Sequence, residues 1–151
     1  MKTLIKNGTV VTASDSIIAD VLIDDEKVIA LGANLPGEGA NVIDARGKFI
    51  LPGGIDVHTH LELVMMGTVS SDDFYSGHRA AAFGGTTSHI DFACQYKDES
   101  LKQALDNWHA KLQGKPVIDY GFHITITDPT DAVIDEIPSM IDEGITTIKL
   151  L

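Results

Sequence analysis

The chain has 151 residues, 44% of them hydrophobic, which is enough for a globular domain with a sizeable core. Its 11 Lys and Arg against 22 Asp and Glu give a formal charge of −11, which would repel nucleic acid phosphates and anionic lipids, so we expect a small-molecule or protein partner. The absence of a signal-peptide-like or membrane-spanning apolar stretch, together with a single cysteine, Cys94, leads us to expect a cytoplasmic protein without an internal disulfide.

Residues 1–52 have the pattern of an all-β region. The dipeptide Asn7-Gly8 lies between two short apolar runs and predicts a hairpin, because these residues readily adopt the positive φ angles of tight turns. Further short strands, separated by polar turns, are expected at residues 21–23, 28–31, 41–43 and 48–51.

Residues 53–60 predict a strand that carries a metal site. Side chains alternate between the two faces of a strand, so Asp56, His58 and His60 are expected on one face. Two residues advance about 6.6 Å along a strand, a separation from which two imidazoles can lean onto one ion. A His-x-His pair alone more often has a structural role, but barrel and doubly wound enzymes place their ligands at strand ends of this kind.

After Pro52 strands and helices alternate. A helix is expected from the acidic start at Ser71-Asp72-Asp73 to Gly84-Gly85, followed by a strand over 86–92. A second helix should begin at Ser100 in a capping box with Gln103 and end before Gly114. Apolar residues recur on one face of this helix at helical spacing, and they are expected in the core: Leu101, Ala104, Leu105, Trp108 and Leu112.

The same alternation continues to the last residue. A strand is expected over 117–127, then a helix that opens at Asp128-Pro129, is broken or kinked at Pro138 and ends at Gly144, then a strand over 145–151. The helix-ending glycines recur at nearly equal spacing, which indicates a repeated βα unit. Such repeats build a parallel sheet, either an eight-fold barrel or an open sheet covered by helices. Because no helix follows the last strand, we expect the chain to be part of a longer protein.

Lys149 is the second residue of chemical interest, because it interrupts an apolar strand. One interpretation is structural: the lysine extends to solvent or forms a salt bridge. The other is functional. A buried lysine with a neutral amine can add carbon dioxide, and the resulting carbamate has two oxygens that can bridge two divalent metal ions.

Residues 53–60 and 144–149 together resemble the dihydropyrimidinase and hydantoinase family of the amidohydrolase superfamily. Supporting similarity extends over almost the whole chain, at residues 5–11, 71–74, 83–87 and 117–123. The resemblance implies an α/β fold: a metal-dependent (β/α)8 TIM barrel preceded by part of a small β-sandwich domain. Residues 1–52 would be the partial β-sandwich domain, and residues 53–151 would be the first half of the barrel.

The resemblance also implies a site. His58 and His60 would bind the more buried of two metal ions, usually zinc, and carbamylated Lys149 would bridge both, with Asp56 behind these ligands. No further catalytic residue is expected in this chain, because the family's other metal-binding His and Asp residues and its oxyanion-stabilising Tyr lie beyond Leu151. The remaining histidines are expected to be structural: His78, His89, His109 and His123.

The implied chemistry is hydrolysis of a cyclic ureide, in which the amide C–N bond opens to give an N-carbamoyl amino acid. Dihydroorotases carry an Arg two positions after the second metal-binding His; Glu62 stands there in this chain, which argues against a carboxylated ring. The residues that follow either line the substrate pocket or are ordinary packing residues: Leu63, Val64 and Met65. Relatives in this family are commonly homotetramers.

Two other functions stay open at this point. One is a non-catalytic dihydropyrimidinase-like scaffold protein, and the other is a cyclic amidase of the allantoinase type. Scaffold relatives have generally lost the metal ligands, so the presence of His58, His60 and Lys149 favours an enzyme.

Overall fold

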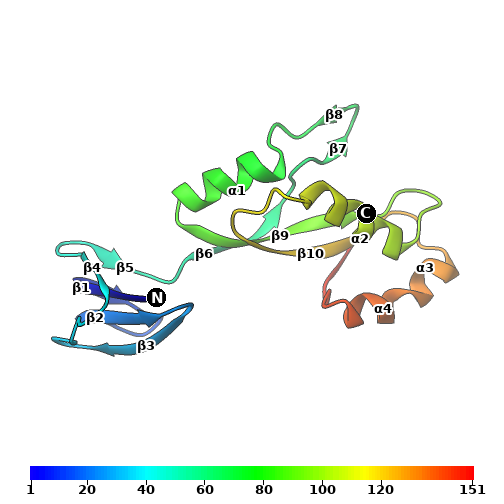
Figure 1. The fold of residues 1–151 in the computed structure, drawn as a ribbon. Helices are drawn as coiled ribbons and strands as arrows, with labels where there is room; N and C mark the ends of the chain where they lie inside the picture. The colour runs from blue at the N-terminus through cyan, green and yellow to red at the C-terminus, as the bar shows by residue number, and fades with distance from the viewer. The chain divides into compact units, whose positions relative to one another are not determined.

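The computed structural model describes residues 1–151 and divides them into two compact units, Met1–Pro52 and Gly53–Leu151. We call them the β unit and the α/β unit, and Figure 1 labels their helices and all of their strands except β11. Each is described by itself. None of the helices has the length and apolar character that crossing a lipid bilayer would require.

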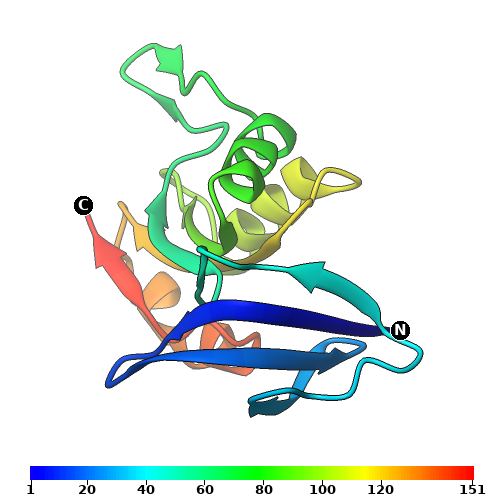
Figure 2. The same ribbon diagram turned by 90° about the vertical axis from the view of Figure 1, so that its left-hand side faces the viewer.

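The β unit is built around its first strand, which has partners on both sides. The strand order is β3-β2-β1-β4, with β5 also paired to β1. The β1–β2 and β2–β3 pairs are antiparallel, whereas β4 and β5 run parallel to β1; Figure 2 shows β1 in dark blue beside its neighbours. The strands are β1 (Lys2–Val11), β2 (Ser16–Asp24), β3 (Lys27–Gly32), β4 (Asn41–Asp44) and β5 (Phe49–Ile50).

The predicted hairpin at Asn7-Gly8 is wrong, because β1 continues through these residues. Asn7 does adopt a positive φ of 63°, but in a bulge that shifts the pairing with β2 between Ile5 and Gly8. The buried carboxylate of Asp20 on β2 accepts the Asn7 N–H at 3.0 Å and so satisfies the donor that leaves the ladder. The chain reverses instead between β1 and β2, where the Thr12 N–H donates to the Asp15 carbonyl at 2.8 Å.

The α/β unit contains a parallel sheet with the order β11-β10-β9-β6, which is also the reverse of the chain order. The sheet is curled, and α1 and α2 both contact β9 (Figure 1). A separate antiparallel hairpin, β7–β8, precedes α1. The sheet strands are β6 (Gly54–Thr59), β9 (Thr86–Cys94), β10 (Asp119–Ile126) and β11 (Ile148–Leu150); the hairpin strands are β7 (Val64–Met65) and β8 (Thr68–Val69).

The helices begin and end close to the predicted residues. The Asp73 carboxylate accepts the Ser76 N–H at 2.7 Å at the start of α1, and Gly85 takes a φ of 85° just after its end. Ser100 caps α2 by accepting the Gln103 N–H at 3.0 Å. The helix expected to break near Pro138 is two short helices that meet at Glu136. The bounds are α1 (Phe74–Phe83), α2 (Leu101–Leu112), α3 (Asp131–Asp135) and α4 (Ile137–Asp142).

The core of the α/β unit lies between α2 and the sheet. Every residue of the predicted apolar face of α2 is buried, and Trp108 is 0% exposed. These side chains pack with Phe122, Ile124 and Ile126 of β10, so α2 and one face of the sheet bury each other. The periodicity of the helix therefore predicted its packing surface correctly.

Replacing Leu105 by Ala should lower the free energy of unfolding by about 2–5 kcal/mol, because it leaves a cavity under α2 where only 2% of the leucine is exposed. Asn107→Ala, on the exposed face of the same helix, is the matched control and should change it by less than about 0.5 kcal/mol. Urea unfolding followed by tryptophan fluorescence measures both. Equal destabilisation by the two variants would contradict this assignment of the core.

Candidate metal centre

The three residues predicted to bind metal converge on the ring of Phe92 in β9. The His58 and His60 ring centroids lie 4.5 and 4.9 Å from that of Phe92, and the two imidazoles are 5.1 Å apart and nearly perpendicular. The Lys149 Nζ lies 4.6 Å from the centre of the same ring. We call these four residues the Phe92 cluster. It brings together β6, the residue after it, β9 and β11.

Strand register explains why Lys149 reaches this cluster. Lys149 pairs with Thr125 of β10, and Thr125 pairs with Cys94 of β9. Paired residues of parallel strands point to the same face, and so do residues two apart on one strand, so Lys149 and Phe92 share a face. The other face of β9 carries His89 and Asp91, which contact α1 and α2.

The electrostatics of the cluster favour a neutral imidazole at His60. Burial lowers the pKa of His60, and Lys149 and His58 lower it further against the opposing effect of Asp91. The His60 Nδ1 atom is buried and has no hydrogen-bond partner. A neutral imidazole with an unpaired nitrogen is the form that binds a metal ion.

The residues present fit a zinc site only if Lys149 takes part. The structure has no group of three or more His, Cys, Asp and Glu side chains placed to hold a metal ion. Lys149 would be the third donor of the cluster if its amine were converted to a carbamate. Two imidazole nitrogens and a carbamate oxygen are donors of the kinds that zinc accepts, so this set is compatible with the metal.

Asp56 does not share a face with the two histidines, contrary to the alternation predicted for residues 53–60. The pairing of β6 with β9 runs from Asp56↔His89 to Thr59↔Asp91, so three steps on β6 oppose two on β9. This bulge places Asp56 beside His89, at a cavity of about 290 Å³ under α1. The Asp56 carboxylate still reaches the cluster through the backbone, because it accepts the His58 N–H at 3.1 Å.

The three candidate pocket residues after His60 have different environments. Leu63 is 6% exposed and belongs to the core of the α/β unit, so it has the packing role that the sequence left open. Val64 and Met65 form β7 of the hairpin and are 59% and 43% exposed. Their side chains are accessible to a ligand.

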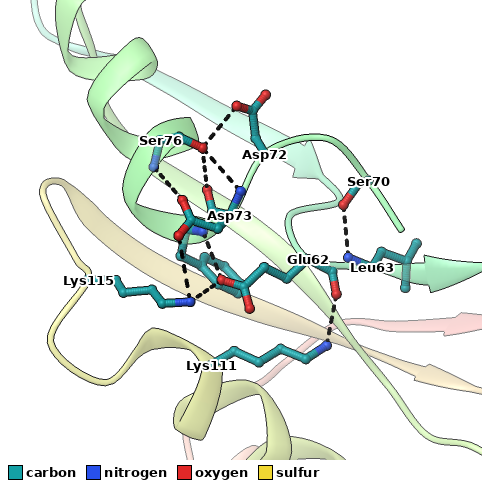
Figure 3. A network of polar contacts seen from close by, with 9 residues as sticks. Glu62, Leu63, Ser70, Asp72, Asp73, Ser76, Lys111 and Lys115 are labelled. Carbon is teal, nitrogen blue, oxygen red and sulfur yellow. Dashed lines mark hydrogen bonds and ion pairs between the residues drawn. The ribbon is translucent and has the colours of Figure 1, made fainter. Parts of the chain in front are cut away.

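The segment after His60 is held by a polar network (Figure 3). Glu62 forms an ion pair with Lys115, which also lies 3.8 Å from the carboxylate of Asp73. The Lys111 Nζ donates to the Glu62 carbonyl at 3.1 Å, and burial lowers the pKa of that lysine. The network joins Glu62, at a positive φ of 49°, to the start of α1 and the end of α2. It therefore anchors the chain two residues beyond a candidate ligand.

His123 was expected to be structural, and its contacts show what it holds. Its Nε2 donates to the Val57 carbonyl at 2.9 Å, its Nδ1 is hydrogen-bonded to the Thr147 hydroxyl, and its ring lies 4.6 Å from that of Phe92. It thus joins the backbone next to His58 to a residue two positions before Lys149. No signal in the sequence showed this, because the facing of β10 depends on its pairing with β9 and β11.

His78 and His89 form a buried pair that sequence reasoning also missed. Their Nε2 atoms are 2.6 Å apart, and the side chains are 1% and 3% exposed. Burial lowers the pKa of His78 to about 4 and also lowers that of His89. Both are therefore neutral at pH 7.

Comparison with known proteins gives strong matches over almost the whole chain, although no protein-family model matches it. The D-hydantoinase of Geobacillus stearothermophilus is 56% identical over 151 residues, which cover 99% of this chain and 32% of that protein. A dihydropyrimidinase of Rattus norvegicus is 42% identical over 153 residues, covering 97% of this chain and 30% of that protein. The crystal structure of dihydropyrimidinase from Brevibacillus agri NCHU1002 matches with a TM-score of 0.94 at 56% identity, covering 98% of this chain and 32% of the other. The chain thus spans about a third of the length of the relatives that it matches.

The stability of the α/β unit should fall as the pH drops from about 6.5 towards 4. Because the pKa of His78 is about 4 in the folded chain, against an ordinary value of 6.5, the unfolded chain binds this proton more tightly. The stabilisation is complete above pH 6.5 and is lost on acidification. Urea midpoints at pH 7 and pH 5 measure it. His78→Gln should reduce the difference between the two midpoints, whereas His109→Gln, at an exposed position, should leave it unchanged; an unaltered difference in the His78 variant would contradict the assignment.

Proposed function

This chain is homologous to the N-terminal third of the D-hydantoinases and dihydropyrimidinases, and we propose that it carries the first metal ligands of a cyclic amide hydrolase. The reaction is hydrolysis of the amide C–N bond in a dihydropyrimidine or hydantoin ring, with an N-carbamoyl amino acid as product. The convergence of His58, His60 and Lys149 on Phe92 is the observation that supports this proposal best.

In this proposal the three polar residues of the Phe92 cluster are the metal ligands. His58 and His60 would hold one divalent metal ion, and the burial of His60 favours its neutral form. The Lys149 amine would add carbon dioxide with release of a proton, and the resulting carbamate would supply oxygen donors to bound metal. Bound zinc ions would lower the pKa of a water molecule and polarise the ring carbonyl.

The sheet order supports a (β/α)8 barrel for the complete protein. In a barrel the parallel strands follow one another around the sheet in chain order, whereas doubly wound sheets reverse direction at a switch point. Here β6, β9, β10 and β11 are adjacent in chain order without a reversal, and the sheet is curled. The β unit then corresponds to part of the small β-sandwich domain.

The family resemblance also leads us to propose a homotetramer in the cytoplasm with a small cyclic ureide as substrate. Light scattering on the purified protein tests the assembly. Parallel assays with dihydrouracil, hydantoin and allantoin test the ring, because an allantoinase-type enzyme would open only the last.

Replacing His58 by Ala in the complete protein should remove both the bound metal and the activity, since one of the two imidazole ligands is lost. Metal per chain by elemental analysis and the rate of hydantoin opening are the measurements. His109→Ala removes an exposed histidine of α2 and is the matched control, expected to keep both. Full metal content in the His58 variant would rule out the ligand assignment.

Lys149→Ala should abolish activity and lower the metal content, because no carbamate can form. Added acetate or propionate should restore part of the activity, since a small carboxylate has the same two oxygen donors. The rate with and without the added acid measures this rescue. A variant that keeps its metal and its rate would show that Lys149 is structural.

A further inference from the structure

We propose that Asp91 is a positioning residue that fixes the metal-binding end of β6 from the opposite face of the sheet. It acts on His60 through the two neighbours of that residue, Thr59 and Leu61. The proposal rests on the proposed function, because it takes His60 to be a metal ligand.

Asp91 is a buried carboxylate with all of its acceptor positions used. It is 0% exposed. Its Oδ2 accepts the Leu61 N–H at 2.9 Å and the Thr59 hydroxyl at 2.8 Å. Its Oδ1 accepts the Phe92 N–H at 2.7 Å and the Trp108 Nε1–H at 3.2 Å. Four donors around a buried carboxylate compensate its loss of hydration and hold each donor in place.

The hydrogen bonds of Asp91 hold the chain at the point where the backbone pairing between β6 and β9 ends. β6 runs only to Thr59, and the last pair in register with β9 is Thr59↔Asp91. His60 therefore lies just past the ladder, where the backbone has no strand partner. Asp91 holds both Thr59, the residue before His60, and Leu61, the residue after it. Because neighbouring side chains point to opposite faces, these contacts direct the His60 side chain toward the face of the Phe92 cluster.

A chain of hydrogen bonds, in which each group has a fixed role as donor or acceptor, requires the Thr59 hydroxyl to donate to Asp91. The Val117 N–H donates to His78 Nδ1 at 3.2 Å, so His78 carries its proton on Nε2. His78 then donates to His89 Nε2 at 2.6 Å, which leaves the His89 proton on Nδ1. That proton is donated to the Thr59 Oγ at 2.7 Å, and the Thr59 hydroxyl donates to Asp91.

The direction of this chain follows from its first donor. A backbone N–H can only donate, so each imidazole in turn has one possible tautomer. This hydrogen-bond chain joins the segment just before β10, α1 and β9 to the end of β6, and all of it lies on the face opposite the Phe92 cluster. It orients the ligand strand without touching the ligands.

The test uses a matched pair at Thr59 in the complete protein. Thr59→Val keeps the shape of the side chain but has no hydroxyl, and Thr59→Ser restores the hydroxyl. We expect the valine variant to bind zinc about 10-fold more weakly and the serine variant to bind it as the wild type does. Zinc affinity is measured by competition with a chelating dye, so the readout does not depend on activity.

Asp91→Asn is the second variant, because an amide presents two hydrogen atoms where Asp91 accepts two donors. It should weaken zinc binding by about 10- to 100-fold, while Asp106→Asn, at an exposed position of α2, should leave it unchanged. The histidine tautomers are read by ¹⁵N NMR on the metal-free protein, with His78 expected as Nε2–H and His89 as Nδ1–H.

The outcomes separate this proposal from the proposed function. Wild-type zinc affinity in both Thr59→Val and Asp91→Asn, with zinc still lost in His58→Ala, would overturn the positioning role and leave the metal site intact. Opposite tautomers at His78 and His89 would also overturn it. Zinc retained in His58→Ala would instead overturn the proposed function.

Discussion

The parallel pairing of β6 with β9 decides what each face of the sheet carries. One face of β9 presents His89 and Asp91 to α1 and α2, and the other presents Phe92 to the candidate ligands. The bulge between Asp56 and Thr59 changes which β6 side chains point to each face of the sheet. Without that shift, Thr59 and Asp91 would not meet in register, and the end of β6 would lack its buried anchor.

Burial has opposite consequences on the two faces. On the helix face the polar atoms of Asp91, His78 and His89 are satisfied within the chain, so their burial rigidifies the sheet. On the other face His60 has a buried nitrogen without a partner, and Lys149 lies over an aromatic ring without a carboxylate in salt-bridge distance. A buried, unpaired imidazole nitrogen gains stability when it binds a ligand, so this face is compatible with the proposed metal site, whereas the helix face is satisfied within the chain.

Local patterns predicted the helices well and the pairing of strands less well. The apolar face of α2 and the caps at Asp73 and Ser100 depend on neighbours three or four residues away, so spacing alone was sufficient. Asn7-Gly8 has the conformation expected of a turn, but the Asp20 carboxylate, 13 residues away, holds it in a bulge. The face of Asp56 was wrong for the same reason: a bulge is a property of two strands, and residues 53–60 show only one of them.

In the candidate site, too, the residues marked by local motifs were predicted and those placed by strand pairing were not. His58, His60 and Lys149 were visible because their residue types and motifs point to metal chemistry, whereas nothing in the sequence joins Asp91 to them. Yet Asp91 and Phe92 are consecutive, and strand alternation sends their side chains to opposite faces. Asp91 binds α2 and the end of β6 on one side, and Phe92 underlies the imidazoles and the lysine on the other. Because the Asp91 carboxylate also accepts the Phe92 N–H, a single buried charge connects helix packing to the placement of the ring on which the ligands converge.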